Sequence, residues 1–164
     1  MTTEGGYVAP GDTAYPVGLL DLEIPPPIYV RGSIPRGSCI SVVGTRTCTR
    51  YGIEIAEALG RRIAGSGMVT VSGLARGIDA AAHRGTVEAG GHGIAILGSG
   101  LDHVYPPENA PLARDLVGLG GAIVSEYPGA TPPDRWRFPA RNRLIAAMSV
   151  ATVVVESKLA GGAQ

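Results

Sequence analysis

The stretch from Val69 to His83 holds a short apolar run, a loop with two glycines and a run of alanines, in that order. The apolar and β-branched residues favour a strand and the alanines favour a helix, so the backbone must change from strand to helix within residues 72–79. A strand, a glycine loop and a helix make half of a βαβ unit. Such a loop lies at the carboxyl edge of a parallel sheet with free N–H groups at the positive end of a helix dipole. The stretch therefore predicts a phosphate-binding site.

The same alternation repeats along the chain. Strands are expected at 39–43, 69–71, 93–97, 122–125 and 150–155, and helices at 51–65, 80–88, 109–117 and from about 139, with Asn109 as a helix cap. This order predicts an α/β fold, a Rossmann-like parallel sheet with helices on both faces. We expect an extended arm at 1–36 with room for a short strand at 28–30, a Rossmann-like DNA-binding domain at 37–156, and a tail at 157–164.

Charge is balanced overall but uneven along the chain. The 14 basic residues equal the 14 acidic ones, yet Arg135, Arg137, Arg141 and Arg143 lie close together. Local density of charge matters more for nucleic-acid binding than the sum. The two cysteines show no pairing or metal-ligand spacing, and no apolar run is long enough to span a bilayer. We therefore expect a cytoplasmic protein with no membrane partner, metal or cofactor.

The loops that leave the strands of a parallel sheet all lie at one edge. Four segments should meet there: residues 44–46, 72–79, 98–100 and 126–143. The candidate contacts in the first three are Gly44, Thr45, Arg46, Ser72, Gly73, Arg76, Gly77 and Ser99. Tight turns between strands and helices also need glycine when no ligand is bound, so a purely structural role is the alternative.

The fourth segment combines arginines with the only tryptophan and the only phenylalanine of the chain. Its candidate contacts are Arg135, Trp136, Arg137, Phe138, Arg141, Asn142 and Arg143. A guanidinium can bind a phosphate while a ring stacks on an unpaired base, worth about 1–3 kcal/mol per base, and this favours single-stranded nucleic acid. The alternative is that the rings anchor the loop to the core and the arginines are solvated.

Patterns typical of nucleotide enzymes and hydrolases are missing. The dinucleotide fingerprint G-x-G-x-x-G does not follow the first strand of the predicted domain, and the Walker A pattern occurs nowhere. Asp79 and His83 have the spacing of a base with its orienting acid, but a charge at the helix start and a packing histidine explain them as well. Glu126 and Glu156 suit either a ribose contact or ion pairs with arginines. We therefore assign no catalytic residue and expect a protein that is not an enzyme.

Four motifs together resemble the DNA-processing protein A family, called DprA or Smf. They are Ser41–Arg46, Ser72–His83, Ala95–Asp102 with Tyr105–Asn109, and Phe138–Ala146. The resemblance covers residues 25–156 and implies a bacterial recombination mediator with a Rossmann-like domain and no known catalysis. In that role it binds and protects incoming single-stranded DNA during natural transformation and helps to load the recombinase RecA.

The resemblance also implies roles for individual residues. Arg46 matches the arginine of the family's Gly-Ser/Thr-Arg turn, and Ser72, Gly73 and Arg76 match its Ser-Gly-Leu-Ala-Arg-Gly loop. A further match, Arg141-Asn142-Arg143, closes the family's basic pocket. Ala140 replaces a basic residue of many relatives, and the family continues beyond Glu156, so we expect a C-terminally truncated domain. The missing part carries the family's homodimer and RecA contacts.

The competing hypothesis is a nucleotide-binding or nucleotide-cleaving enzyme on the same type of fold. It would be similar to the lysine-decarboxylase-like phosphoribohydrolases, which also place glycine loops at the sheet edge. Those enzymes use a Pro-Gly-Gly-x-Gly-Thr loop with a nearby glutamate, and this sequence has no such loop.

Overall fold

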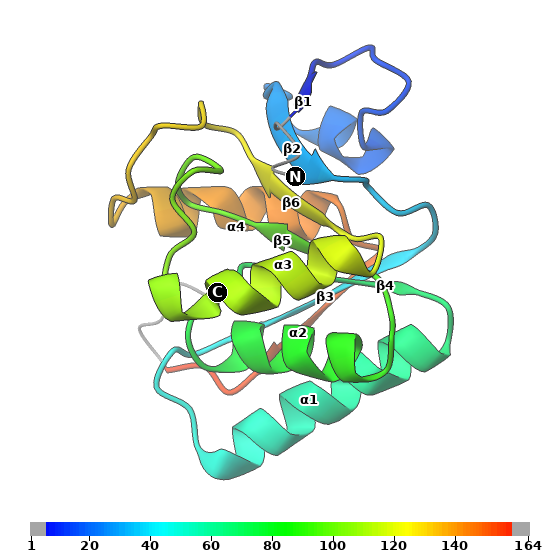
Figure 1. Ribbon diagram of the computed structural model, residues 1–164, viewed down its shortest axis with the longest axis vertical. Coiled ribbons are helices and arrows are strands. Elements are labelled where there is room, and N and C mark those ends of the chain that lie inside the picture. Colours follow the sequence, from blue (N-terminus) through cyan, green and yellow to red (C-terminus); the bar gives the residue numbers. More distant parts are fainter. Residues whose placement is uncertain (1–5, 159–164) are drawn as a thin grey trace.

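The computed structural model describes residues 6–158, which form one mixed sheet with helices on both faces (Figure 1). The strands are β1 (Gly6–Val8), β2 (Ile28–Gly32), β3 (Cys39–Gly44), β4 (Val69–Ser72), β5 (Gly93–Ile96), β6 (Ala122–Ser125) and β7 (Ala151–Val155). The α-helices are α1 (Arg50–Gly65), α2 (Ile78–Glu88), α3 (Ala110–Gly118) and α4 (Arg137–Ala147), and the 3₁₀ turns are η1 (Val17–Asp21) and η2 (Pro107–Asn109). The α/β, Rossmann-like prediction is confirmed.

The sheet has the strand order β1-β2-β6-β5-β4-β3-β7 among the described residues. The strands from β3 to β7 are parallel to one another, whereas β6 pairs antiparallel with β2 at its other edge. Successive strands from β3 to β6 advance in one direction, and β7 then returns to the other side of β3. The order therefore reverses at β3, and in open α/β sheets ligands bind outside the carboxyl ends of the strands at such a point.

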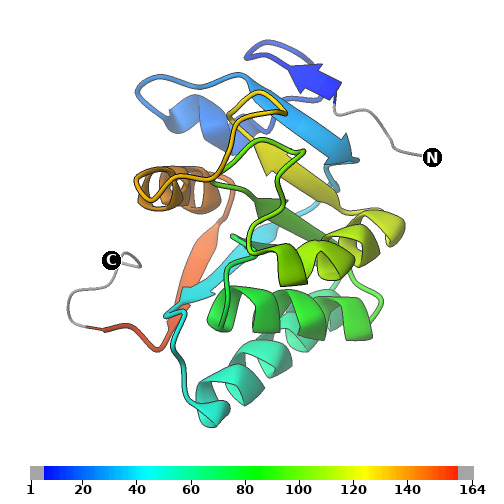
Figure 2. The ribbon, with the colours of Figure 1, turned by 60° about the vertical axis from the view of Figure 1, so that its left-hand side comes forward.

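Helices α1, α2 and α3 cover one face of the sheet, and α4 with η1 covers the other (Figure 2). Strands β4, β5 and β6 are buried along their whole length, because both faces are covered. Within β5, Ile94 and Ile96 pack toward α4, whereas Ala95 packs toward α3. This burial explains why these strands are mainly apolar, with only small hydroxyl residues between or after the apolar ones.

Helices α1 and α2 approach each other closely because each has a glycine at the contact. A Cβ at Gly60 would lie 2.1 Å from the carbonyl oxygen of Ala82, and one at Gly85 would lie 2.0 Å from that of Glu57. Any larger residue at either position would push the two backbones apart. The two helices therefore form one rigid pair beneath the sheet.

The N-terminal segment differs from the extended arm that we predicted for residues 1–36. In its described part, β2 pairs antiparallel with β6 and β1 pairs antiparallel with β2. Leu19 of η1 is fully buried, and Tyr15 is buried with its hydroxyl donating to the carbonyl of Pro26 at 2.6 Å. The segment thus extends the sheet and its core, so no break in the sheet marks the predicted boundary near 36.

Element boundaries elsewhere differ by a few residues. Helix α4 begins at Arg137, before Pro139, because proline is tolerated in the first turn of a helix. Asn109 stands at the start of α3, but its side-chain amide donates to the carbonyl of Leu74 at 2.8 Å and makes no capping bond. It therefore ties η2 to the loop after β4. Among the described residues, every helix is too short or too polar to cross a membrane.

Candidate nucleic-acid interface

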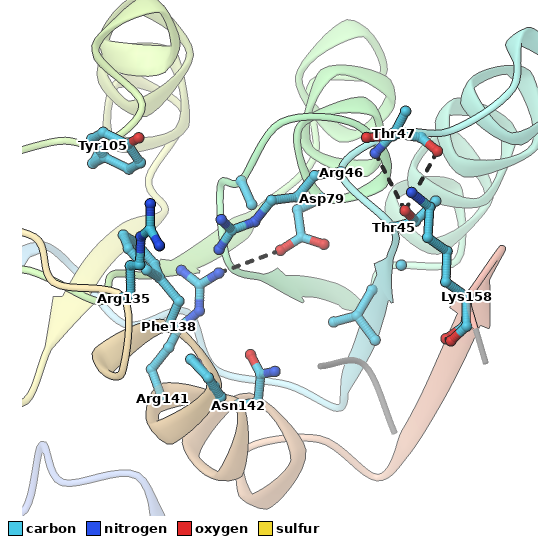
Figure 3. Close-up of a pocket in the computed structure, with 15 residues that line it drawn as sticks. Thr45, Arg46, Thr47, Asp79, Tyr105, Arg135, Phe138, Arg141, Asn142 and Lys158 are labelled. Atoms are coloured by element: carbon cyan, nitrogen blue, oxygen red, sulfur yellow. Dashed lines mark hydrogen bonds and ion pairs between the residues drawn. The ribbon is translucent and has the colours of Figure 1, made fainter. Parts of the chain in front are cut away.

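A cavity of about 660 Å³ opens at the carboxyl edge of the sheet, where the strand order reverses (Figure 3). We call it the edge pocket. It lies between the loops that follow β3, β4 and β7 and the start of α4. The predicted segments 44–46, 72–79 and 126–143 contribute lining residues, whereas residues 98–100 do not, and the loop after β7 was not predicted. Its lining residues are Val43, Gly44, Thr45, Arg46, Thr47, Ala75, Asp79, Tyr105, Arg135, Phe138, Pro139, Arg141, Asn142, Ser157 and Lys158.

Three basic side chains from three different segments line the edge pocket with their charges uncompensated. Arg46 follows β3, Arg135 precedes α4, and Lys158 follows β7 (Figure 3). None of the three forms an ion pair with another residue in the range 6–158. The guanidinium of Arg46 lies 4.8 Å from the ring centre of Phe138, an arrangement that leaves its N–H groups available. The cavity therefore has a positive wall and an aromatic surface beside it.

Arg141 lies in the floor of the edge pocket and is committed to the protein. It is 3% exposed, and its Nη1 donates to the carbonyls of Gly73 at 2.5 Å and Ile96 at 2.7 Å. Its Nη2 lies 3.7 Å from Oδ2 of Asp79. Burial lowers the pKa of Arg141 to about 10, so it stays charged at neutral pH. Our sequence interpretation made Arg141 a phosphate contact, whereas the structure uses it to hold the loops after β4 and β5 together.

The glycine loop after β4 is filled from within. The backbone N–H of Gly73 donates to Oδ2 of Asp79 at 3.1 Å, so a carboxylate of the protein occupies the start of α2. Burial raises the pKa of Asp79, and the charge of Arg141 and the hydrogen bond from Gly73 oppose that rise. A Cβ at Gly73 would lie 2.2 Å from the Arg141 guanidinium, so glycine is needed for this packing. The phosphate site predicted from this loop alone is therefore taken by Asp79.

The two serines of the predicted site point inward. Ser72 is fully buried and donates to the carbonyl of Val42 at 2.6 Å, and Ser99 is buried and donates to that of His103 at 2.6 Å. Neither side chain reaches the edge pocket. Gly77 has a φ of +82° and stands so close to the carbonyl of Thr45 that a Cβ would lie 2.5 Å from it. These residues shape the loops and do not contribute side-chain donors to the cavity.

Three further arginines of the predicted site lie outside the edge pocket: two form ion pairs, and the third donates to a main-chain carbonyl. Arg143 binds both carboxylate oxygens of Glu126, at 2.8 and 2.6 Å, which answers whether Glu126 pairs with an arginine. Arg76 binds Glu108 at 2.5 Å and borders a smaller adjoining cavity. Arg137 donates to the carbonyl of Pro132 at 2.5 Å. The dense run of arginine at 135–143 therefore divides between different surroundings.

The two rings of the predicted site are separated. Phe138 lines the edge pocket, whereas Trp136 is 57% exposed outside it and meets Tyr127 at a centroid distance of 6.2 Å. Their spacing of two would place them together on a strand, but α4 begins between them. Sequence reasoning missed Tyr105, whose ring lies 5.4 Å from that of Phe138, and Lys158. The signal for Tyr105 was the Tyr-Pro-Pro segment after β5, in the same layer of loops.

His83 belongs to the core and not to a catalytic pair. Its ring is fully buried, and burial lowers its pKa to about 4. Neither ring nitrogen has a hydrogen-bond partner within the described part of the chain. Asp79, one helical turn earlier, is engaged with Gly73 and Arg141. The packing interpretation of this histidine therefore agrees with its surroundings.

Residues 6–164 match the family model described as DNA recombination-mediator protein A. The chain belongs to this family. It is 39% identical to the protein Smf of Synechocystis over 96% of its own length and 41% of the relative, and 38% identical to DprA of Bacillus subtilis over 90% and 51%. The chain thus spans about half the length of the curated relatives that it matches.

Two solved DprA structures share this fold over nearly the whole chain. DprA of Streptococcus pneumoniae superposes with a TM-score of 0.85 at 33% identity, covering 97% of this chain and 56% of that one. DprA of Helicobacter pylori, whose structure is described for its single-stranded DNA binding mode, gives 0.83 at 28% identity, covering 99% and 74%.

Proposed function

We propose that this chain binds single-stranded DNA in the edge pocket. Arg46, Arg135 and Lys158 contact phosphates, and Phe138 with Tyr105 offers ring surface to an unpaired base. The observation that carries the proposal is the convergence on one cavity of three cations that form no ion pair with any described residue, beside an aromatic surface. Phosphate contacts supply affinity and register, and stacking requires a base that is free of a partner strand.

The cavity favours one strand over a duplex for a geometric reason. Phe138 is half-buried and Arg46 lies over its ring, so a base must leave any helical stack to reach it. The description of the Helicobacter pylori relative supports the same ligand. Asp79, the acid that lines the cavity, is engaged by Arg141 and so repels a phosphate less than a free carboxylate would.

The wider role is proposed from family membership. The chain acts as a recombination mediator that protects single-stranded DNA taken up in natural transformation and assists RecA loading, without catalysis of its own. The relatives named DNA processing protein support this assignment. RecA and a homodimer partner stay predictions, and both are tested by copurification and light scattering.

The deciding experiment is a fluorescence anisotropy titration with an oligothymidine strand and with a duplex of equal length. We expect tighter binding of the single strand and an affinity that falls steeply with salt, because each phosphate contact releases about 0.7 counterions from a single strand. Replacing Arg135→Ala should weaken binding about three- to tenfold, whereas Arg143→Ala, at a residue already paired with Glu126, should change it less.

Equal affinity for both ligands, or no response to salt, would refute the proposal. Incubation with nucleoside monophosphates followed by chromatography tests the competing hypothesis, and release of free base would favour a phosphoribohydrolase.

A further inference from the structure

Glu156 is the residue that joins the end of β7 to the loop after β3. Its main-chain carbonyl accepts a hydrogen bond from the N–H of Thr45 at 2.8 Å. Its side-chain carboxylate accepts a second from the N–H of Thr49 at 2.8 Å and a third from the Thr49 hydroxyl. One residue therefore holds both ends of the segment 45–49, and Arg46 lies between the two anchors.

The carboxylate also completes helix α1. Thr49 is the N-cap of α1 and its hydroxyl accepts from the N–H of Gly52 at 3.0 Å, while the first turn of the helix contains no acidic residue. Glu156 supplies the missing negative charge from another strand, where it favours the positive end of the helix dipole. These hydrogen bonds from Thr49 lower the pKa of Glu156, so the carboxylate is ionised at neutral pH.

Two features show that the protein is built around this carboxylate. Glu156 has a φ of +52°, a backbone conformation that residues other than glycine rarely adopt. A Cβ at Gly52 would lie 2.6 Å from the carboxylate carbon, so α1 has room for Glu156 only because residue 52 is glycine. Within residues 6–158, Glu156 thus binds Thr49 and does not form the arginine pair that its sequence position suggested.

We propose that Glu156 is a positioning residue that fixes the loop after β3 so that Arg46 faces the edge pocket. The inference rests on the proposed function, because Arg46 is taken to contact single-stranded DNA. Glu156 itself does not touch the nucleic acid. Its contribution reaches the ligand through the two anchors at Thr45 and Thr49.

Two substitutions weaken the contacts between the Glu156 carboxylate and Thr49 in different ways. Glu156→Gln keeps the size of the side chain but removes its charge and one acceptor oxygen, and Gly52→Ala keeps the glutamate but places a methyl group against it. The matched control is Gly65→Ala in the same helix, where an added Cβ would meet no atom within 4 Å. All three variants keep Arg46.

Amide hydrogen exchange of the ligand-free protein tests the positioning directly. We expect the amides at 45–49 to exchange about tenfold faster in Glu156→Gln and in Gly52→Ala, with unchanged exchange in the central strands. Gly65→Ala should match the wild-type chain. Unchanged exchange at 45–49 in both Glu156→Gln and Gly52→Ala would overturn the inference. This measurement does not depend on DNA.

A double-mutant cycle with an oligothymidine strand tests whether the effect passes through Arg46. We expect Glu156→Gln to weaken binding about fivefold, to have no further effect when Arg46→Ala is present, and to keep its full effect when Arg135→Ala is present. The same fivefold loss in the Arg46→Ala background would overturn the inference. If the wild-type chain itself does not bind the strand, the proposed function fails, and the exchange measurement alone decides the role of Glu156.

Discussion

The loops after β3 and β4 look alike in sequence but differ in what they present to the edge pocket. Counted from the last residue of each strand, the segments 44–49 and 72–77 both contain glycine, at least one hydroxyl residue and one arginine, and each leads into a helix. In both, a carboxylate of the protein sits at the helix start, Glu156 for α1 and Asp79 for α2. The loop after β3 leaves Arg46 free of ion pairs with described residues, whereas Arg76 of the other loop is bound to Glu108.

This difference shows that a glycine loop before a helix is not in itself a phosphate site. The positive end of the helix attracts any anion, and a glutamate or aspartate of the same chain can be that anion. Here the ligand is expected at the arginine and lysine side chains around the loops, not at the amides of the loops. Substitutions at either loop test this difference, and we expect the largest effect at the buried pair of Arg141 and Asp79.

Replacing Arg141→Met should lower the free energy of unfolding by about 3–5 kcal/mol, because Asp79 would be left as a buried charge without its partner. Urea unfolding followed by circular dichroism measures the loss. The control is Arg50→Met, which removes an exposed pair with Glu54 and should cost less than about 1 kcal/mol. Similar losses of unfolding free energy in Arg141→Met and Arg50→Met would mean that Arg141 does not stabilise the loop after β4.

The stability of the loop after β4 and of α2 should also decrease in acid because of His83, which lies in α2. The folded state keeps its pKa at about 4, below the ordinary value of 6.5, so the unfolded chain binds a proton more readily as pH falls below 6.5. Between pH 6.5 and 5 the unfolding free energy should drop by about 2 kcal/mol from this group. Urea midpoints at the two pH values measure it.

The variant that isolates this contribution is His83→Leu, in which the decline should be smaller by that amount. His92→Leu, at an exposed histidine, should keep the wild-type decline. An equal decline in wild type and in His83→Leu would show that the buried histidine does not set the acid response.

The role of the loop after β3 is tested by comparing Arg46→Ala with Arg76→Ala. Loss of Arg46 should weaken oligothymidine binding about tenfold and reduce the salt slope by about 0.7, because it removes one phosphate contact. Loss of Arg76 should have a smaller effect, since its charge is already offset by Glu108 at 2.5 Å. Anisotropy titrations over a range of salt concentrations measure both. Equal losses would erase the distinction between the two loops.

The parallel part of the fold was predictable because its strands are buried on both faces. Val69 and Val71, Ile94 and Ile96, and Ala122 to Val124 give short, mainly apolar runs between helices, and their order implied a site at the carboxyl edge of the sheet. The short strand expected at 28–30 is present as β2, but β1 and the pairing of both strands into the sheet were not predicted, because β2 pairs with β6, far away in sequence. Nothing local in residues 6–32 indicates that pairing.

The division of the arginines could not be predicted either. Arg76, Arg141 and Arg143 are the same residue type as Arg46, and what separates them is a distant partner. Glu108, Asp79 and Glu126 lie between 17 and 62 residues away in the chain and meet their arginines only after the sheet has formed. Local density of charge therefore indicated the edge of the molecule where the edge pocket lies, but not which arginines line it.

Under the proposed function, the close glycine contacts between α1 and α2 have a consequence for how the edge pocket accommodates different nucleotides. Because Gly60 and Gly85 lock the two helices backbone to backbone, the loops that enter them cannot shift independently. Any adjustment of the edge pocket to a larger purine or a smaller pyrimidine is then expected in the segment between β6 and α4. This segment carries Arg135 and forms another wall of the pocket. We expect NMR relaxation of the protein, bound to oligonucleotides that differ in base, to show motion in this segment that depends on the base. Residues 44–49 should show the same restricted motion with every oligonucleotide.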